Sequence, residues 1–327
     1  MKLVTYSVGS DKRSGLVVGK DNGTVVDLAR AIAWADKAAA DKHLADTVLG
    51  FVEHARDARP LADKAIAAFE KGELPAELTK KLADVTLLSP IPRPPSMRDG
   101  YAFRQHVETA RRNRGLEMIP EFDQFPVFYF TNHQAVIGPG PVRVKPRHLE
   151  KLDFELEAAI VVGKECRDLS AASADDAIFG MTIMNDWSAR VLQMDEMKLS
   201  LGPAKGKDFA TSLGPWLVTM DELAEKTIKT PNGNQFDLGM RAWVKGVQVS
   251  TGNVKDMTWT FAQILERASY GVTLYPGDVI GSGTCGTGCF LELNGSKITD
   301  NQWLHPGEVV ALEIDRLGRL ENTIVAD

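Results

Sequence analysis

The stretch Lys151-Leu-Asp-Phe-Glu-Leu-Glu157, which continues as Ala158-Ala-Ile-Val-Val-Gly163, has the pattern of a β-strand. Alternate residues of a strand face opposite sides, so Glu155 and Glu157 share one face and Leu156 lies on the other. The continuation is apolar on both faces, which is typical of a strand buried on both sides of a sheet. We therefore expect an acidic pair at the beginning of a buried strand.

Two carboxylates side by side on a partly buried strand repel each other and lose hydration. A positive group is therefore expected between Glu155 and Glu157, and a divalent metal is the simplest candidate. Carboxylate oxygens suit a hard cation such as Mg²⁺, Ca²⁺ or Mn²⁺. The alternative is a strand at the edge of a sheet, with both glutamates solvated.

The composition is that of an ordinary globular protein, with 327 residues, 44% of them hydrophobic and 25% charged. The net charge of −6 argues against a nucleic-acid-binding surface, and no apolar run is long enough to span a membrane. The N-terminus lacks the apolar core of a signal peptide. The sparse cysteines, Cys166, Cys285 and Cys289, fit a reducing compartment, so we expect a cytoplasmic protein and interpret the Cys285–Cys289 spacing as incidental.

A proline-rich connector, Val85–Pro95, separates two regions of different character. Residues 1–28 predict a small β unit, and residues 29–83 predict alanine-rich helices. We expect an N-terminal domain over residues 1–90 and a main domain over residues 91–327.

The main domain is rich in predicted strands, which favours a mixed, β-rich α+β fold over a doubly wound one. The predicted strands cover 127–131, 142–144, 154–162, 180–184, 213–219, 240–244, 247–249, 279–280, 289–293 and 308–314. The predicted helices cover about 99–114, 173–179, 187–197 and 258–268.

Two candidate site residues follow the connector. Asp99 can cap a helix that begins there, and His106 is either a satisfied histidine or a general base, since neutral imidazole can abstract a proton near pH 7. The arginines at 111, 112 and 114 are usually a solvated helix face, but one of them could clamp a substrate carboxylate.

Further candidates lie in the segments that follow predicted strands. Asp186 is a helix cap or a residue at the rim of a site, and Lys207 is a solvated loop residue or an ammonium aimed at developing negative charge. The motif Gly281-Ser-Gly-Thr-Cys-Gly286 matches G-x-G-x-x-G, but a strand is predicted after it where a dinucleotide-binding loop would open a helix. We expect this loop to bring its backbone and Thr284 close to a ligand.

Taken together, these motifs resemble the fumarylacetoacetate hydrolase (FAH) superfamily. The matching motifs are Asp99-x-Tyr101-x₄-His106, Arg114-Gly115, Pro126-Val-x-Tyr129, Glu155-x-Glu157, Asn185-Asp-Trp-Ser-Ala-Arg190, Gln193, Leu201-Gly-Pro203 with Gly206-Lys207, Ser282-Gly-Thr284 and Leu291-Glu292. They run in order from about residue 90 to 315, and their combination is more specific than any one of them.

The resemblance implies a mixed β-sandwich-roll catalytic domain behind a small N-terminal α/β domain, commonly in a homodimer. It also implies a site for Mg²⁺ or Ca²⁺, with Mn²⁺ as a further option, whose ligands are Asp99, Glu155, Glu157 and Asp186. That ligand set agrees with the argument from charge, because converging carboxylates need a cation.

Within the superfamily, the motifs are most similar to those of fumarylacetoacetases, which act in the degradation of tyrosine and other aromatic compounds. The similarity implies hydrolysis of a carbon–carbon bond in a small β-diketo acid. His106, oriented by Glu292, would activate water, and Lys207 and Gln193 would stabilise the departing carbanion. Substrate groups would be positioned by Tyr101, Arg114, Tyr129, Arg190 and Thr284.

The chain departs from fumarylacetoacetases in two loops. The segment between Arg190 and Lys207 is slightly longer, and the segment between Thr284 and Glu292 is much shorter, which leaves the substrate open. The alternatives are an acylpyruvate hydrolase, an isomerase or decarboxylase of a hydroxydienedioate, and a binding protein that holds a diacid without turning it over. The presence of both His106 and Glu292 favours hydrolysis.

Overall fold

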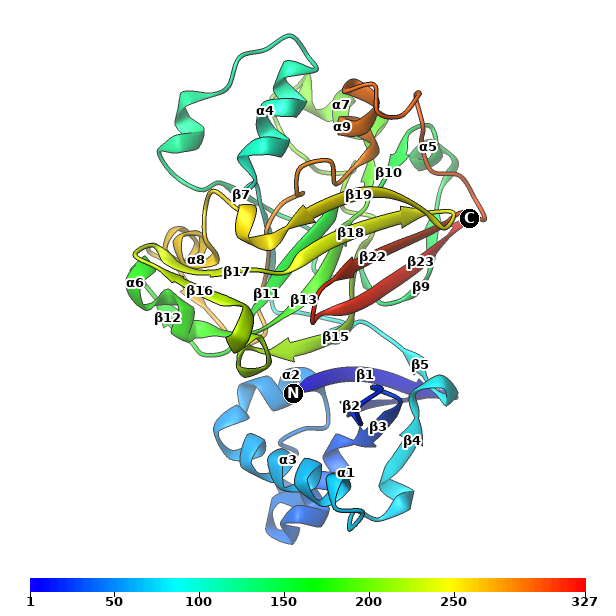
Figure 1. Cartoon of the computed structure of the whole chain (residues 1–327), viewed down its shortest axis with the longest axis vertical. Helices are drawn as coiled ribbons and strands as arrows, with labels where there is room; N and C mark the ends of the chain where they lie inside the picture. Colours follow the sequence, from blue (N-terminus) through cyan, green and yellow to red (C-terminus); the bar gives the residue numbers. More distant parts are fainter.

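A large mixed sheet runs through the molecule, which a computed structural model describes over residues 1–39 and 42–327 (Figure 1). Its strands follow the order β4-β3-β2-β1-β15-β13-β11-β21-β6-β7, with β5 beside β1 and β8 beside β15. Their bounds are β1 Lys2–Val8, β2 Asp11–Val18, β3 Thr24–Asp27, β4 Thr79–Lys81, β5 Thr86–Leu87, β6 Met97–Gly100, β7 Phe128–Phe130, β8 Val136–Ile137, β11 Leu156–Val162, β13 Ile178–Asp186, β15 Thr211–Thr219 and β21 Val279–Gly281.

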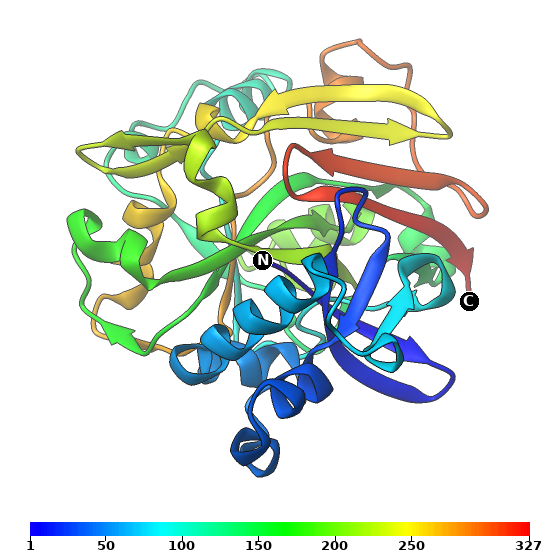
Figure 2. The same ribbon diagram turned by 60° about the horizontal axis from the view of Figure 1, so that its bottom comes forward.

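A smaller sheet, in the order β19-β18-β22-β23-β9, packs against this one. Figure 2 shows its two hairpins, β18–β19 and β22–β23, side by side. Its bounds are β9 Gly140–Val144, β18 Gly239–Val244, β19 Val247–Asn253, β22 Val309–Ile314 and β23 Gly318–Ala326. Short ladders pair β10 Leu152–Asp153 with β14 Ser188–Ala189, β12 Cys166–Arg167 with β20 Thr273–Leu274, and β16 Thr227–Thr230 with β17 Gly233–Phe236.

The helices lie around these sheets. Their bounds are α1 Leu28–Ala35, α2 Val48–Glu53, α3 Ala55–Glu70, α4 Arg104–Arg112, α5 Pro146–Leu149, α6 Ala171–Ala174, α7 Arg190–Met197, α8 Phe261–Ser269 and α9 Phe290–Gly295. Within residues 1–39 and 42–327, none of them has the length and apolar character needed to cross a membrane.

Strand β11 separates two hydrophobic cores. Leu156 and Ile160 join the core between the two sheets, whereas Ala159 and Val161 join the core beneath helices α1 to α3. Each fully buried aliphatic side chain of this kind contributes roughly 1.5–3 kcal/mol to folding. The strand is therefore buried on both faces, as its sequence predicts, and the β-rich α+β fold is confirmed.

The N-terminal strands extend the main sheet, because β1 pairs with β15 in antiparallel register. Helices α1 and α3 cover this part of the sheet through small apolar side chains such as Ala31 and Ala62. The division of the chain into domains at residue 90 stays a prediction.

Two predicted elements are wrong, and the helix expected over 187–197 begins only at Arg190, because Ser188–Ala189 is a short strand that pairs with β10. The helix expected over 99–114 begins only at Arg104, because Met97–Gly100 is a strand that pairs with β21 and β7. The strand expected over 289–293 is helix α9, whose first N–H groups, those of Phe290 and Leu291, donate to the carboxylate of Asp153. Both errors come from partners that are distant in sequence.

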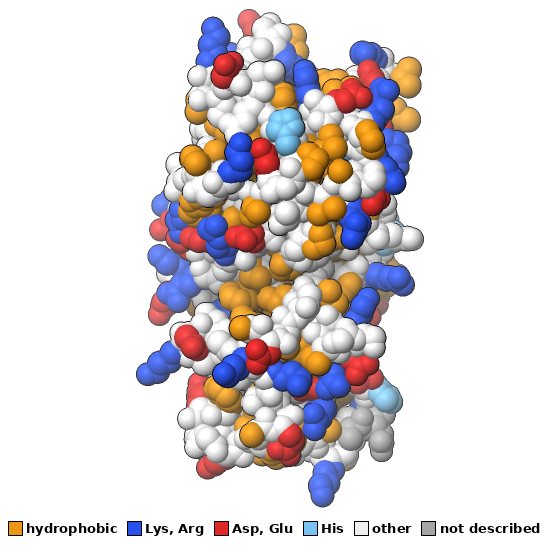
Figure 3. Space-filling view, turned by 90° about the vertical axis from the view of Figure 1, so that its right-hand side faces the viewer, with side chains coloured by type: hydrophobic (Ala, Val, Ile, Leu, Met, Phe, Trp, Pro, Cys, Tyr) orange, Lys and Arg blue, Asp and Glu red, His pale blue; other side chains and the backbone are white. Residues whose placement is uncertain are grey.

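The face in Figure 3 carries basic and acidic side chains interspersed with one another, and hydrophobic side chains gather about halfway down it. A surface with both signs of charge mixed creates no strong field of one sign on this face.

Candidate active site

Four buried carboxylates meet where strands β6, β11 and β13 come together. They belong to Asp99 on β6, Glu155 just before β11, Glu157 on β11 and Asp186 at the end of β13. One oxygen from each lies within 4.8 Å of the others. Strand alternation predicts only that the glutamates lie side by side, and the family resemblance adds the two aspartates. The sheet brings these aspartates to the glutamates, because β11 lies between β13 and β21 and β21 pairs with β6.

The loop after β21 fits closely around Asp99. The N–H of Gly283 donates to Asp99 Oδ1 over 3.1 Å. Gly283 has a φ of +77°, and a Cβ atom there would lie 2.6 Å from the carbonyl oxygen of Gly100. Only glycine can adopt this conformation without strain, so the G-x-G-x-x-G pattern serves a close backbone approach to the carboxylates. The loop does approach the site with its backbone, as the sequence suggests.

Positive side chains lie against the acidic cluster. Lys207 Nζ is 2.5 Å from Glu155 Oε2 and 2.6 Å from Asp186 Oδ2. Arg190 reaches Glu155 Oε1 over 2.7 Å. The positive charge that the sequence predicts beside Glu155 is thus supplied, in this arrangement, by two side chains.

Two carboxylate oxygens of the cluster lack a hydrogen-bonding partner among the described residues. Among the described residues, Glu157 Oε2 and Asp186 Oδ1 are buried and have no hydrogen-bond partner. Burial, reinforced by Asp186, raises the pKa of Asp99 to about 8, and burial together with Asp99 raises the pKa of Glu157 well above its usual range. A hard cation would bind the unpartnered oxygens and would favour the ionised form of these carboxyl groups. The four residues therefore suit a divalent metal site.

Glu155 behaves differently from its neighbours. Burial opposes its ionisation, but the charges of Lys207 and Arg190 outweigh that effect and lower the pKa of Glu155 to about 2. Burial also raises the pKa of Asp186 despite the nearby Lys207. The cluster therefore holds one firmly ionised carboxylate beside groups whose charge depends on a cation.

His106 and Glu292 form a buried pair next to these carboxylates. His106 Nδ1 lies 2.7 Å from Glu292 Oε2. An ionised glutamate accepts a hydrogen bond from Nδ1–H. The imidazole then keeps its proton on Nδ1, and the lone pair of Nε2 is available as a base. The ring of Tyr101 packs against His106 edge-on, with ring centroids 5.8 Å apart. This arrangement can hold an imidazole in one tautomer and orientation.

A cavity of about 360 Å³ opens onto the cluster. Of the residues proposed from the sequence, those that line the cavity are Asp99, Tyr101, His106, Arg114, Tyr129, Glu155, Glu157, Arg190, Gln193, Lys207 and Thr284. Asp186 and Glu292 lie behind this lining, where they contact Lys207 and His106. The structure therefore brings all the proposed residues to one site.

Two of these residues donate hydrogen bonds to carboxylates of the acidic cluster. The hydroxyl of Tyr129 donates to Asp186 Oδ2 over 2.6 Å, and that of Thr284 donates to Glu157 Oε1 over 3.3 Å. Arg190 is buried and also donates to Gln193 Oε1 over 3.0 Å. Arg114, in contrast, is exposed at the mouth of the cavity.

A larger cleft of about 1050 Å³ adjoins this cavity. The two share a wall made by Ala110, Arg114, Arg190, Met194 and Leu291. Arg114 thus stands between the cavity and open solvent.

Asp153 supports the site and was missed in the sequence analysis. Its carboxylate accepts from Arg190 Nε over 2.9 Å and from the N–H groups of Phe290 and Leu291, and it is fully buried. It therefore fixes both Arg190 and the helix that carries Glu292. The signal was available, because Asp153 precedes Glu155 and Glu157 at the same alternate spacing.

Residues 96–325 match the family model described as fumarylacetoacetate (FAA) hydrolase C-terminal. The chain is 31% identical to a fumarylacetoacetase from Oryza sativa, over 74% of this chain and 68% of that one. It is 33% identical to the fumarylacetoacetase of Bos taurus, over 60% of this chain and 58% of that one. A 2,4-didehydro-3-deoxy-L-rhamnonate hydrolase from a Sphingomonas strain is also 33% identical, over 59% and 62%. The matches thus span roughly three fifths to two thirds of these relatives.

Solved structures share the fold over the whole chain. A fumarylacetoacetate hydrolase from Exiguobacterium antarcticum superposes with a TM-score of 0.71 at 24% identity, with both chains covered completely. A 5-carboxymethyl-2-hydroxymuconate delta-isomerase from Mycobacterium smegmatis gives a TM-score of 0.66 at 24% identity, again over both whole chains. At this identity the likeness concerns the fold.

Proposed function

We propose that this chain, which belongs to the fumarylacetoacetate hydrolase family, hydrolyses a carbon–carbon bond in a β-diketo acid with a divalent cation bound. The observation that carries the proposal is the His106–Glu292 pair beside four convergent carboxylates. We favour fumarylacetoacetate, cleaved to fumarate and acetoacetate, because relatives at 31–33% identity bear the name fumarylacetoacetase.

The cation, for which we propose Mg²⁺ or Ca²⁺, would be held by Asp99, Glu155, Glu157 and Asp186. When bound, it would polarise the carbonyl group of the substrate and stabilise negative charge on the enolate oxygen. The orphaned oxygens of Glu157 and Asp186 support this assignment, because each lacks a partner among the described residues.

His106 acts as the general base in this scheme. Its Nε2 takes a proton from a water molecule, and the oxygen of that water attacks the carbonyl carbon. Glu292 stabilises the imidazolium that forms, because its carboxylate lies 2.7 Å from Nδ1. Both groups are buried, so their interaction is weakly screened by solvent.

Cleavage then separates an acid from a carbanion. The bond between the attacked carbon and its methylene neighbour breaks, the electron pair stays on the methylene carbon, and the imidazolium returns the proton to that carbon. Lys207 and Gln193 line the cavity and would stabilise the negative charge as it develops. The balance is one water consumed and two acid products released.

The mouth of the cavity could bind a carboxylate at the end of the substrate that lies away from the cation. Arg114 is exposed there, and Arg guanidinium groups bind carboxylates through two parallel hydrogen bonds. Tyr101 lies beside His106 and would orient the same end of the substrate. A diacid therefore fits the charge of this cavity.

An isomerase or decarboxylase acting on a hydroxydienedioate is the second candidate. The same cation and enolate chemistry would serve such an enzyme. Its reaction needs no activated water, however, so the His106–Glu292 pair would have no water to activate. An acylpyruvate hydrolase differs only in the acyl group. A diacid-binding protein without turnover is the candidate from another class.

A spectrophotometric assay tests the proposal. The protein is incubated with fumarylacetoacetate, acylpyruvates or a hydroxydienedioate, in Mg²⁺ or in EDTA, and His106→Asn serves as the control variant. Loss of diketone absorbance that requires Mg²⁺ and His106 and yields two acids is expected. Turnover of the dienedioate alone would move the protein to the isomerase or decarboxylase class, and binding without turnover would make it a diacid-binding protein.

A further inference from the structure

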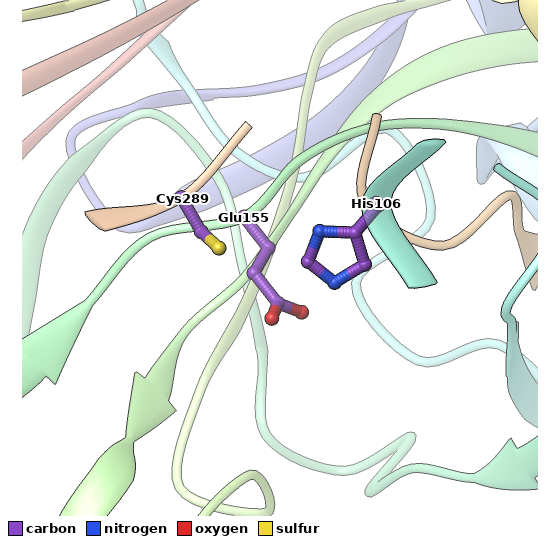
Figure 4. Close-up of side chains that lie close together, drawn as sticks. All are labelled: His106, Glu155 and Cys289. Atoms are coloured by element: carbon purple, nitrogen blue, oxygen red, sulfur yellow. The ribbon is translucent and has the colours of Figure 1, made fainter. Parts of the chain in front are cut away.

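A second cluster of potential metal ligands shares one residue with the acidic site. His106, Glu155 and Cys289 each offer an atom that lies within 4.8 Å of the others, and all three residues are buried. Figure 4 shows the three side chains converging, with the imidazole and the carboxylate turned toward each other and the thiol on the far side of Glu155. The spacing of Cys289 from Cys285 does not by itself indicate a metal site, but the fold places Cys289 beside two other potential ligands.

The donor atoms of this cluster differ from those of the acidic site. It combines an imidazole nitrogen, a thiol sulfur and a carboxylate oxygen, which is a set that binds Zn²⁺ and similar thiophilic ions and not Mg²⁺ or Ca²⁺. Zinc lies about 2.0–2.3 Å from such ligands, so its tetrahedral ligands lie roughly 3.3–3.8 Å apart. Movements of about 1 Å by side-chain rotation would therefore bring these three atoms to a common ion.

The surroundings favour such an ion in two ways. Glu292 holds His106 by a 2.7 Å hydrogen bond, which is the carboxylate–histidine arrangement that fixes a metal-binding imidazole. His106 and Glu155 line the active-site cavity, so an ion can reach them from solvent. Arg190 and Lys207 contact the oxygens of Glu155 and oppose a dication there, so the ion depends on the imidazole and the thiol for its affinity, while the oxygens of Glu155 still carry further lone pairs.

We propose that His106, Glu155 and Cys289 form a second site for a thiophilic divalent cation such as Zn²⁺, whose occupation blocks the active site. On binding, the thiol of Cys289 loses its proton to solvent and forms the sulfur–metal bond. The bound ion occupies the lone pair of the imidazole and one lone pair of Glu155. The metal site depends only on its three donor atoms, whereas inhibition of the active site also depends on the proposed function, in which His106 is the general base.

Cobalt is a suitable probe, because a Co²⁺ ion bound by thiolate shows charge-transfer absorption in the near ultraviolet, whereas one bound by oxygen alone does not. The protein is titrated with Co²⁺ in the absence of Mg²⁺, because Mg²⁺ at the acidic site would compete for the shared Glu155, and Co²⁺ bound there by oxygens alone gives no such band. We expect the absorption band in the wild type and its loss in Cys289→Ser and Cys289→Ala. Cys285→Ser is the matched control, since Cys285 is also buried but lies outside the cluster, and it should keep the band.

Two variants of Cys289 guard against a folding defect in one of them, and circular dichroism checks both. Absence of the band in the wild type, or its persistence in a folded Cys289 variant, would overturn the proposed site. Inhibition by Zn²⁺ is then measured on any substrate that turns over, and Cys289→Ser should raise the inhibition constant at least about tenfold relative to Cys285→Ser. A failure of the proposed hydrolase would show as absent turnover with the cobalt band intact, so the two proposals can be separated.

Discussion

His106 Nδ1 and Glu292 Oε2 lie 2.7 Å apart although 186 residues separate them in the sequence. Helix α4 carries the histidine and helix α9 carries the glutamate, and these two helices pack against each other. Both side chains are buried, so this hydrogen bond lies in a poorly solvated setting, where it is electrostatically stronger than in water.

Replacing Glu292 with Gln should leave the fold intact and reduce turnover by about 10²-fold or more, because the amide can still accept from Nδ1–H but cannot stabilise the imidazolium. The measurement is kcat with the preferred substrate, together with Mg²⁺ affinity, which should change little. Glu150→Gln at an exposed position is the control. An unchanged kcat would remove Glu292 from the proposed role.

Replacing Lys207 with Met should tighten Mg²⁺ binding about tenfold, which is about 1.4 kcal/mol, while it lowers turnover. The reason is that the ammonium lies 2.5–2.6 Å from two carboxylates proposed to bind the ion, so it repels a dication there. Isothermal titration calorimetry with Mg²⁺ gives the affinity. Lys205→Met, which removes an exposed ion pair with Asp208, is the matched control and should change neither quantity. Weaker Mg²⁺ binding in Lys207→Met would contradict the argument.

Replacing Asp153 with Asn should destabilise the protein by about 3–5 kcal/mol, because it leaves the buried guanidinium of Arg190 with one fewer anionic partner. It should also disturb the first turn of helix α9. Urea unfolding measures the free energy. Asp195→Asn breaks exposed ion pairs with Arg147 and Lys198 and should cost no more than about 1 kcal/mol. Equal effects of the two variants would show that Asp153 is not a support of the site.

The stability of the protein in EDTA should fall as the pH rises from about 5 to about 8. Burial raises the folded-state pKa of Asp99 to about 8, so the folded state binds a proton that the unfolded state has released, and its contribution is lost as the pH passes the folded pKa. Glu155 has a lowered pKa of about 2, so its contribution is lost only at acidic pH below this window. Thermal unfolding should show a decrease in Tm of several degrees, at roughly 2–4 °C per kcal/mol.

Saturating Mg²⁺ is expected to remove this decrease, because an ion favours the ionised form of Asp99. Asp99→Asn should make the profile in EDTA less steep, since it has no proton to lose at this position, while Glu157 and Asp186, whose pKa values burial also raises, keep part of the decrease. A Tm in EDTA that rises between pH 5 and 8 in the wild type would show that the carboxylates of the site are compensated in another way.

Local patterns of residues suffice to predict the buried strand and the chemistry of its acidic face. Residues 158–162 are apolar on both faces of the strand, which requires two apolar environments, and β11 indeed lies between two cores. The resemblance of ordered motifs also indicated which distant residues gather at Glu155 and Glu157, and the structure places them around one cavity. Periodicity and motifs are local or ordered along the chain, so they can be read without coordinates.

The geometry of the individual charge contacts, and the ends of the elements, depend instead on packing between residues that are distant in the chain. Met97–Gly100 is a strand because β21 and β7 supply its hydrogen bonds, and α9 is a helix whose N-terminus is capped by Asp153. The contact of Lys207 with Glu155 and the approach of Cys289 to His106 have the same origin. These interactions join residues far apart in the chain, and their energies depend on burial, which local sequence patterns do not contain.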